Sequence, residues 1–133
     1  MLGIFKKVAD INVDAVIVTN FDGDIVYVND AFTESTGYAF DEVKGKNPRI
    51  IKGGYLPEEY YREMWDALKS GKEWSGEFLN KDKFGQEYWA FSRIAPATDI
   101  HGSIYFVAVQ QNITKIKELE AKLVSLSDRA NIL

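Results

Sequence analysis

Hydrophobic and polar residues alternate along the chain with two different periods, and the period indicates the type of each element. Two β-branched runs, at 15–19 and 25–28, flank the sequence FDGD, and an Asp-Gly pair between such runs is typical of a β-hairpin. A period of two returns at 73–81, 86–95 and 104–111, which predicts three further strands. The pattern therefore predicts five strands, two before and three after a central region of different period.

The central region carries the signals of several short helices. Asn29 and Asp30 can cap a short helix that Gly37 ends, and Asp41 can cap a further turn or two. The clearest helix begins at Pro57, has two glutamates in its first turn and ends before a glycine. Because the long antiparallel strands need cover on one face, these helices must pack there. The pattern predicts an α+β fold, a sheet with a helical cover.

Both ends of the chain predict helices outside this layer. Residues 1–12 carry aliphatic residues at helical spacing, which indicates an amphipathic lead-in helix. Beyond residue 113, apolar residues three and four positions apart form the a/d seam of a coiled coil: Ile116, Leu119, Leu123, Leu126, Ala130 and Leu133. About two and a half heptads are marginal alone, so the seam is interpreted as the start of a longer one. We expect a lead-in helix at 1–12, one domain at 13–114 and a signalling helix at 115–133.

Composition narrows the class of protein. The length of 133 residues suits one domain, and 46% hydrophobic with 27% charged residues is typical of a globular one. The net charge of −4 argues against a nucleic-acid partner. No apolar run is long enough to cross a membrane and no signal peptide opens the chain, so a cytoplasmic protein is expected. The lack of cysteine and the single His101 argue against thiol, zinc and triad chemistry, and no enzyme is expected.

One face of the predicted sheet mixes small residues, aromatic residues and amides. Strand alternation assigns to it Gly76, Phe78, Asn80, Tyr88, Ala90, Ser92, Ile94, Phe106, Ala108 and Gln110. Small residues leave volume unfilled, and buried amides need hydrogen-bond partners. A flat heteroaromatic ligand with polar edges would satisfy both needs. The alternative is that the two amides lie at strand ends and bond to water or to turn backbone.

Outside the strands, two groups of residues have side chains of functional interest. The loop GKNPRIIKGGY at 45–55 carries Arg49 and Lys52 among apolar residues, and both could bind a phosphate near the mouth of a pocket. An ordinary solvated loop is the alternative. The three tryptophans, Trp65, Trp74 and Trp89, are expected to pack in the core or in a dimer seam.

Four segments of the chain resemble PAS sensory domains in their order: DAVIVTNFDGDIVYVNDAFTESTGY, GKNPRI, EYYREMWDALKSGKEWSGEFLNKDKFGQEYW and VQQNIT. The resemblance covers about residues 11–114. It implies a five-stranded antiparallel sheet in the order 2-1-5-4-3, with small helices over one face and a ligand between them. This architecture agrees with the element order that the periodicity predicts.

Within that family, GKNPRIIK is similar to the flavin-binding stretch of LOV photoreceptors. Pro48 stands at the place of their photoactive cysteine, which excludes the covalent flavin–thiol photocycle. The resemblance implies that Asn80 and Gln110 contact a flavin, whereas Ala90 replaces a second flavin-binding asparagine and that contact is missing. NPRI together with WSGEFLNKDKFGQEYW is closer to redox-sensing PAS domains that hold FAD non-covalently.

The resemblance implies a cofactor site without catalytic or metal-binding residues. Its expected members are Asn47, Arg49, Lys52, Phe78, Asn80, Tyr88, Ala90, Ala108 and Gln110. Asn80 is expected to bond the pyrimidine edge of the flavin, and Gln110 the N5/O4 edge. Asn47 is expected to contact the ribityl chain, and Arg49, helped by Lys52, the phosphates. The remaining members are expected to lie against the ring.

The expected function follows from that site. FAD is the expected cofactor and FMN the alternative. Haem is not expected, because 55–71 lacks the histidine that haem-binding PAS domains supply there. The domain is expected to form a homodimer through its terminal helices and to pass a redox or light signal to an output domain such as a histidine kinase. The alternatives are a ligand-free dimerisation module and a PAS domain that binds another small metabolite.

Overall fold

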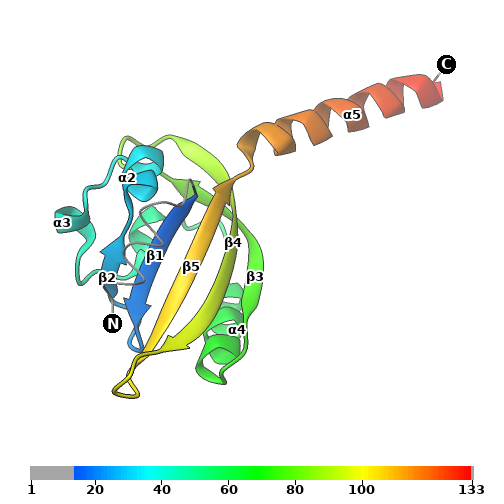
Figure 1. Ribbon diagram of the computed structural model, residues 1–133. Coiled ribbons are helices and arrows are strands. Elements are labelled where there is room, and N and C mark those ends of the chain that lie inside the picture. The colour runs from blue at the N-terminus through cyan, green and yellow to red at the C-terminus, as the bar shows by residue number, and fades with distance from the viewer. Residues whose placement is uncertain (1–13, 133) are drawn as a thin grey trace.

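A five-stranded antiparallel sheet forms the centre of the molecule (Figure 1). The computed structural model describes residues 14–132, with side chains to residue 130, so the predicted lead-in helix at 1–12 lies outside the described residues. The strands are β1 (Ala15–Asn20), β2 (Ile25–Val28), β3 (Trp74–Lys81), β4 (Glu87–Thr98) and β5 (Ile104–Asn112). Their order, β2-β1-β5-β4-β3, confirms the predicted topology.

Helices connect the first two strands to the last three. They are α2 (Asp30–Thr36), α3 (Phe40–Val43), the 3-10 helix η1 (Pro48–Ile51) and α4 (Glu58–Lys69), and α5 (Thr114–Ile132) follows the sheet. Asn29 caps α2 and Gly37, with φ of 77°, ends it, as predicted. The expected capping role of Asp41 is wrong. The cap of α3 is Ala39, two residues earlier, and the Glu42 side chain accepts a hydrogen bond from the backbone N–H of Ala39 at 3.0 Å.

The strand β4 runs three residues beyond its predicted end. It includes Pro96, which pairs with Phe106 of β5. The pairing of β4 with β3 stops at Ile94, so Pro96 lies where β4 has become an edge strand, and a missing N–H is tolerated there. The extension lengthens the β4–β5 ladder next to the turn at 99–103, which connects the two strands.

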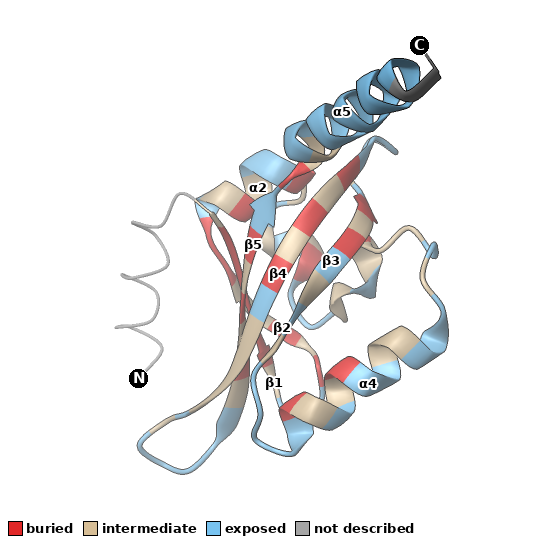
Figure 2. Cartoon of the chain, turned by 90° about the vertical axis from the view of Figure 1, so that its right-hand side faces the viewer, coloured by how far each residue is buried: buried red, intermediate tan, exposed pale blue. Residues whose placement is uncertain are grey.

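Two apolar clusters fill the space between the inner face of the sheet and the helices. The first contains Ala15, Ile17, Ile25, Val28, Phe32, Val43, Ile51 and Ala108, and the second contains Met64, Leu68, Phe78 and Phe106. Figure 2 shows the buried residues alternating with less buried ones along β3 and β4. Small helices cover the first cluster and α4 covers the second, so α4 and the neighbouring strands position the candidate site.

The helix α5 projects away from the sheet (Figure 1). Its side chains from residue 118 to residue 130 are exposed, as the pale blue helix in Figure 2 shows. The apolar seam residues of the described part, among them Ile116, Leu119, Leu123 and Leu126, are therefore in solvent. Across residues 14–132, no helix combines the length and the hydrophobicity that a bilayer crossing needs.

Candidate functional site

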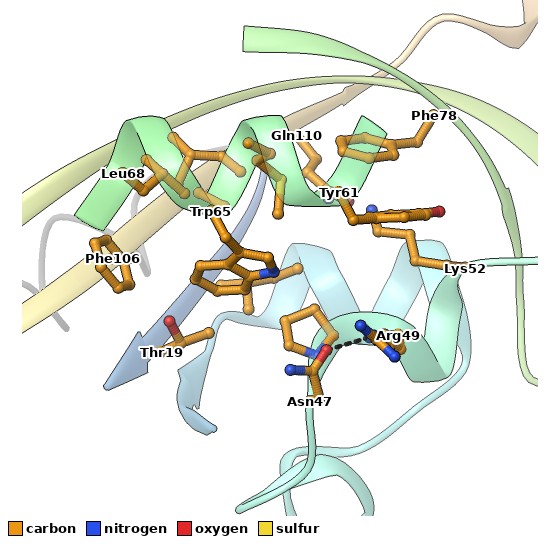
Figure 3. Close-up of a pocket in the computed structure, with 15 residues that line it drawn as sticks. Thr19, Asn47, Arg49, Lys52, Tyr61, Trp65, Leu68, Phe78, Phe106 and Gln110 are labelled. Carbon is orange, nitrogen blue, oxygen red and sulfur yellow. Dashed lines mark hydrogen bonds between the residues drawn. The ribbon is translucent and has the colours of Figure 1, made fainter. Parts of the chain in front are cut away.

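A cavity lies between the inner face of the sheet, the η1 segment and α4 (Figure 3). Its sheet side carries Ile17, Phe78, Phe106, Ala108 and Gln110, and its α4 side carries Tyr61, Met64, Trp65 and Leu68. Its mouth carries Asn47 and Arg49, and Lys52 lines it over the Phe78 ring. The space open to the centres of water molecules is about 40 Å³, enough for a few waters. Apolar side chains dominate the lining, and no carboxylate of the described residues takes part in it.

The predicted site residues divide into two groups. Six of the nine line the cavity: Asn47, Arg49, Lys52, Phe78, Ala108 and Gln110. Asn80, Tyr88 and Ala90 are buried on the same face of the sheet but outside the cavity lining. The strand register explains their grouping, because Asn80 lies opposite Tyr88 and Phe78 lies opposite Ala90. These three residues form a floor beside the cavity.

Asn80 is fully buried, yet its side chain has no hydrogen-bond partner among the described residues. Both its amide nitrogen and its amide oxygen are unpaired, and so are the buried hydroxyls of Tyr88 and Ser92. Burial raises the pKa of Tyr88 to about 12, and the nearby Asn80 amide offsets part of the rise without reaching hydrogen-bonding geometry. Each unpaired buried polar group costs about 1–3 kcal/mol. The cluster therefore lowers the stability of the fold unless a ligand or water forms hydrogen bonds with it.

Gln110 connects this polar floor to the cavity. It is 7% exposed and lines the cavity from β5. Its register partner on β4 is Ser92, one of the residues with an unpaired hydroxyl, and its partner on β1 is Ala15. Because directly opposite residues share a face of the sheet, a polar ligand at this place would meet Gln110 and Ser92 together.

The mouth of the cavity is built by η1. The side-chain oxygen of Asn47 accepts a hydrogen bond from the backbone N–H of Arg49 at 3.0 Å, which caps η1. Arg49 is exposed and lies beside Asn47 in Figure 3. Asn47 thus has a structural role in addition to its place in the lining.

Lys52 differs from Arg49 in its surroundings, although the two were expected to contact a phosphate together. Its side chain runs inward, and its Nζ lies 3.5 Å from the centroid of the Phe78 ring (Figure 3). Although the residue as a whole is only partly buried, its amine is enclosed, and burial alone lowers the pKa of Lys52 to about 7. The backbone of Lys52 also forms an isolated antiparallel bridge with Asn80. The amine of Lys52 is therefore enclosed, whereas Arg49 is exposed.

The sequence analysis missed the contribution of α4 to the site. Trp65 packs against the second apolar cluster, as expected of a core residue, and it also lines the cavity, where it meets the Phe106 ring edge-on at 5.5 Å. Tyr61 stacks on Phe78 with ring centroids 6.0 Å apart. A signal was present, because Tyr61, Met64, Trp65 and Leu68 recur at the spacing of one helix face. Trp74 packs against Phe78 as a core residue should.

Comparison with known proteins identifies the family. The family model of the PAS domain matches residues 13–115, and the chain belongs to this family. It is 30% identical over 122 residues to the nitrogen fixation regulatory protein of Klebsiella oxytoca, covering 91% of this chain and 25% of that protein. It is 29% identical over 131 residues to the blue-light-activated histidine kinase of Brucella abortus (strain 2308), covering 92% and 27%. The chain thus spans about a quarter of the length of these curated relatives.

Solved structures share the fold. An RNA-binding light-oxygen-voltage receptor superposes with a TM-score of 0.81 at 23% identity, covering 96% of this chain and 37% of that one. The PAS domain of a protein from Colwellia psychrerythraea superposes with a TM-score of 0.75 at 23% identity, covering 86% and 98%. The chain is a PAS sensory domain, and the predicted resemblance and fold are confirmed.

Proposed function

We propose that this PAS domain is a sensory module that holds a flavin non-covalently between the sheet and α4 and signals its redox or light state through α5. The observation that carries the proposal is the buried and unpartnered amide of Asn80, next to an apolar cavity that has two cations and no carboxylate among its described lining residues. The name of one relative, a blue-light-activated histidine kinase, supports a light stimulus. The resemblance of NPRI and WSGEFLNKDKFGQEYW to redox-sensing PAS domains supports a redox stimulus.

The residues fit a flavin in polarity, and side chains occupy much of the space it needs. The unpaired amide nitrogen of Asn80 can donate and its unpaired amide oxygen can accept, which matches the alternating carbonyl and N–H groups of a pyrimidine edge. Exposed Arg49 can meet a phosphate at the mouth. Ligand pockets usually measure ~300–1,000 Å³, far more than this cavity. Binding therefore requires Tyr61 and Trp65 to move away from the sheet.

The route of the signal starts at Gln110. When bound, a flavin supplies a ring atom, N5, that changes from hydrogen-bond acceptor to donor on reduction. Gln110 then has to present its amide oxygen in place of its amide nitrogen, because an unpaired buried partner is costly. Three residues further on, Ile113 donates a backbone hydrogen bond to Trp89 at 2.8 Å, and the Thr114 hydroxyl accepts one from Trp89 at 2.8 Å. These bonds hold the start of α5 against β4, while the chain enters α5 directly from β5. A shift of β5 relative to β4 should therefore change the direction of α5.

The visible absorption spectrum of freshly purified protein tests the proposal. Structured bands in the blue region that bleach with dithionite are expected, and identification of the released cofactor distinguishes FAD, which we propose, from FMN. Colourless protein that takes up no added flavin contradicts the proposal. A Soret band would instead identify haem.

The role of Gln110 has a matched control in the next residue. Replacing Gln110 by Leu should leave the flavin bound, held by Asn80 and the apolar lining, and should abolish the redox-dependent change in α5. The exposed Gln111 points to the opposite face of β5, so Gln111→Leu should behave as wild type. Amide hydrogen exchange of α5 in the oxidised and reduced states measures the effect. Normal coupling in the Gln110 variant would exclude this route.

We further infer that α5 pairs with a second copy of the chain and leads to an output domain such as a histidine kinase. Leu119 and Leu123 are 52% and 66% exposed, which leaves the apolar seam without cover from its own chain within the described residues. Light scattering over a range of protein concentrations should show a dimer, and replacing both leucines by Glu should give a monomer.

A ligand-free interaction module is the second candidate function, and the small volume of the cavity favours it. In that case the protein is colourless, added flavin does not raise its melting temperature, and dimerisation through α5 persists. A colourless protein that another small molecule stabilises would identify a metabolite sensor.

A further inference from the structure

Lys52 is held beside Asn80 by the backbone. The isolated bridge between the two residues is antiparallel, and residues that face each other in such a bridge project their side chains to the same side. Asn80 points into the protein, and the amine of Lys52 lies over Phe78, which is two residues before Asn80 on the same face of β3. The amine is therefore at the inner end of the cavity, whereas Arg49 is exposed at the mouth.

The amine has no counter-charge among the described residues. No carboxylate lines the cavity there, and the salt bridges of the described chain involve Lys83 and Lys117 instead. Burial alone lowers the pKa of Lys52 to about 7, with no contribution from a charged neighbour. An enclosed amine without an acidic partner is unfavourable in the empty domain. It becomes favourable when a ligand brings negative charge or an electron-rich carbonyl to the same place.

We propose that Lys52 faces the polar ring edge that Asn80 binds, and that its charge sets the midpoint potential of the sensor. The inference rests on the proposed function, since it assigns a role toward a bound flavin. Two-electron reduction by an external reductant, with uptake of one proton, leaves one negative charge on the ring. An ammonium group close to that charge in a site of low dielectric favours the reduced over the oxidised state. Arg49 acts at the other end, on the phosphate.

Two variants of matched chemistry separate the two cations. Lys52→Met removes the inner charge and keeps an unbranched apolar chain, and Arg49→Met does the same at the mouth. For each, the midpoint potential is measured by equilibration with a redox dye, and affinity is measured for oxidised FMN and for riboflavin, which lacks the phosphate.

We expect Lys52→Met to reduce the preference for the reduced flavin about tenfold, which lowers a two-electron potential by about 30 mV. Its ratio of FMN to riboflavin affinity should stay within about twofold of wild type. Arg49→Met should give the opposite pattern, with FMN losing affinity relative to riboflavin and the potential unchanged. Lys52→Arg should keep the wild-type potential.

The result that overturns the inference is a Lys52→Met variant with an unchanged potential and a reduced ratio of FMN to riboflavin affinity, because Lys52 would then serve the phosphate. Circular dichroism melting checks that each variant folds. If Lys52→Met does not fold, Lys52→Gln supplies the same comparison with a polar neutral side chain. Failure of wild-type protein to bind any flavin overturns the proposed function itself, and is distinct from failure of Lys52 alone.

Discussion

Asn29 and Asn80, the two buried asparagines among the described residues, have opposite environments. Asn29, 2% exposed, uses its side-chain oxygen to accept hydrogen bonds from the backbone N–H groups of Val16 and Phe32, at 2.9 and 3.0 Å, and donates to the carbonyl of Asp14 at 2.9 Å. Asn80 is completely buried, and neither its donor nor its acceptor has a partner among the described residues. The same type of side chain is thus fully hydrogen-bonded next to the edge strand β2 and unpaired on the opposite edge strand, β3.

The two regions of the inner face differ in how far their buried polar groups are hydrogen-bonded. Around Asn29, the start of α2 and the strand β1 are joined by one side chain within a cluster of packed aliphatic residues. Around Asn80, unpaired hydroxyls, an amine without a counter-charge and a cavity occur together. Natural proteins satisfy more than 90% of their buried polar groups, so this concentration of exceptions supports the proposal that a ligand binds here.

Replacing each asparagine by Leu gives the largest expected contrast. Asn29→Leu leaves two backbone N–H groups and one carbonyl without their partner, and should lower the free energy of unfolding by about 3–4 kcal/mol. Asn80→Leu removes only unpaired groups, so the stability of the ligand-free protein should be unchanged or higher. Urea unfolding of ligand-free protein measures both.

The affinity for flavin should rank the two variants in the opposite order to their stability. Asn80→Leu should weaken the binding of added flavin about tenfold or more, while the folded fraction of Asn29→Leu should bind it normally. Loss of stability in Asn80→Leu that equals the loss in Asn29→Leu would show that Asn80 is an ordinary structural residue.

Lys52 provides a second contrast, which depends on pH. Its pKa of about 7 in the folded ligand-free protein is below the value of 10.5 expected in the unfolded chain. Between pH 7 and pH 10 the unfolded state therefore binds more protons, and the free energy of unfolding of the wild type should rise with pH, by ~2–3 kcal/mol from pH 7 to pH 9. Tyr61, which stacks on Phe78, has a pKa raised by burial and stays neutral in this range.

The variant Lys52→Met should lack this rise. Its stability should exceed that of the wild type most at pH 7 and below, and the advantage should shrink toward pH 10. Urea unfolding at pH 6, 7, 8 and 9 measures the curve, and Lys72→Met, at an exposed site, is the control. Parallel curves for wild type and Lys52→Met would show that the amine is solvated in the ligand-free protein.

The sequence predicts the fold well because each element has its own local signal. The cap at Asn29, the glycine at Gly37 and the alternation of β3, β4 and β5 each specify one piece, and the sheet order follows from the family resemblance. Alternation also predicted that Asn80 and Gln110 share a face. Local signals are sufficient wherever the partners of a residue are close in sequence or lie on a neighbouring strand.

The position of the Lys52 side chain could not be predicted from such local signals. Residues three apart in a 3-10 helix lie on the same side, which would place Lys52 with Arg49 at the mouth. Lys52 is instead the residue that ends η1, with extended φ and ψ of −88° and 129°, and its backbone pairs with Asn80, 28 positions away. No pattern in the sequence indicates that contact. It is formed only when η1 and β3 are brought together by the tertiary structure.

The smallest expected contrast is between two buried hydroxyls. Thr36 donates from its hydroxyl to the carbonyl of Phe32 at 2.8 Å and accepts from the N–H of Tyr38 at 3.2 Å, whereas the hydroxyl of Ser92 has no partner among the described residues. Thr36→Val should therefore cost about 1 kcal/mol, and Ser92→Ala should cost nothing or stabilise the ligand-free protein slightly. Urea unfolding resolves the difference. If added flavin then stabilises the wild type more than Ser92→Ala, the hydroxyl contacts the ligand. Equal stabilisation would show that the Ser92 hydroxyl takes no part in recognition.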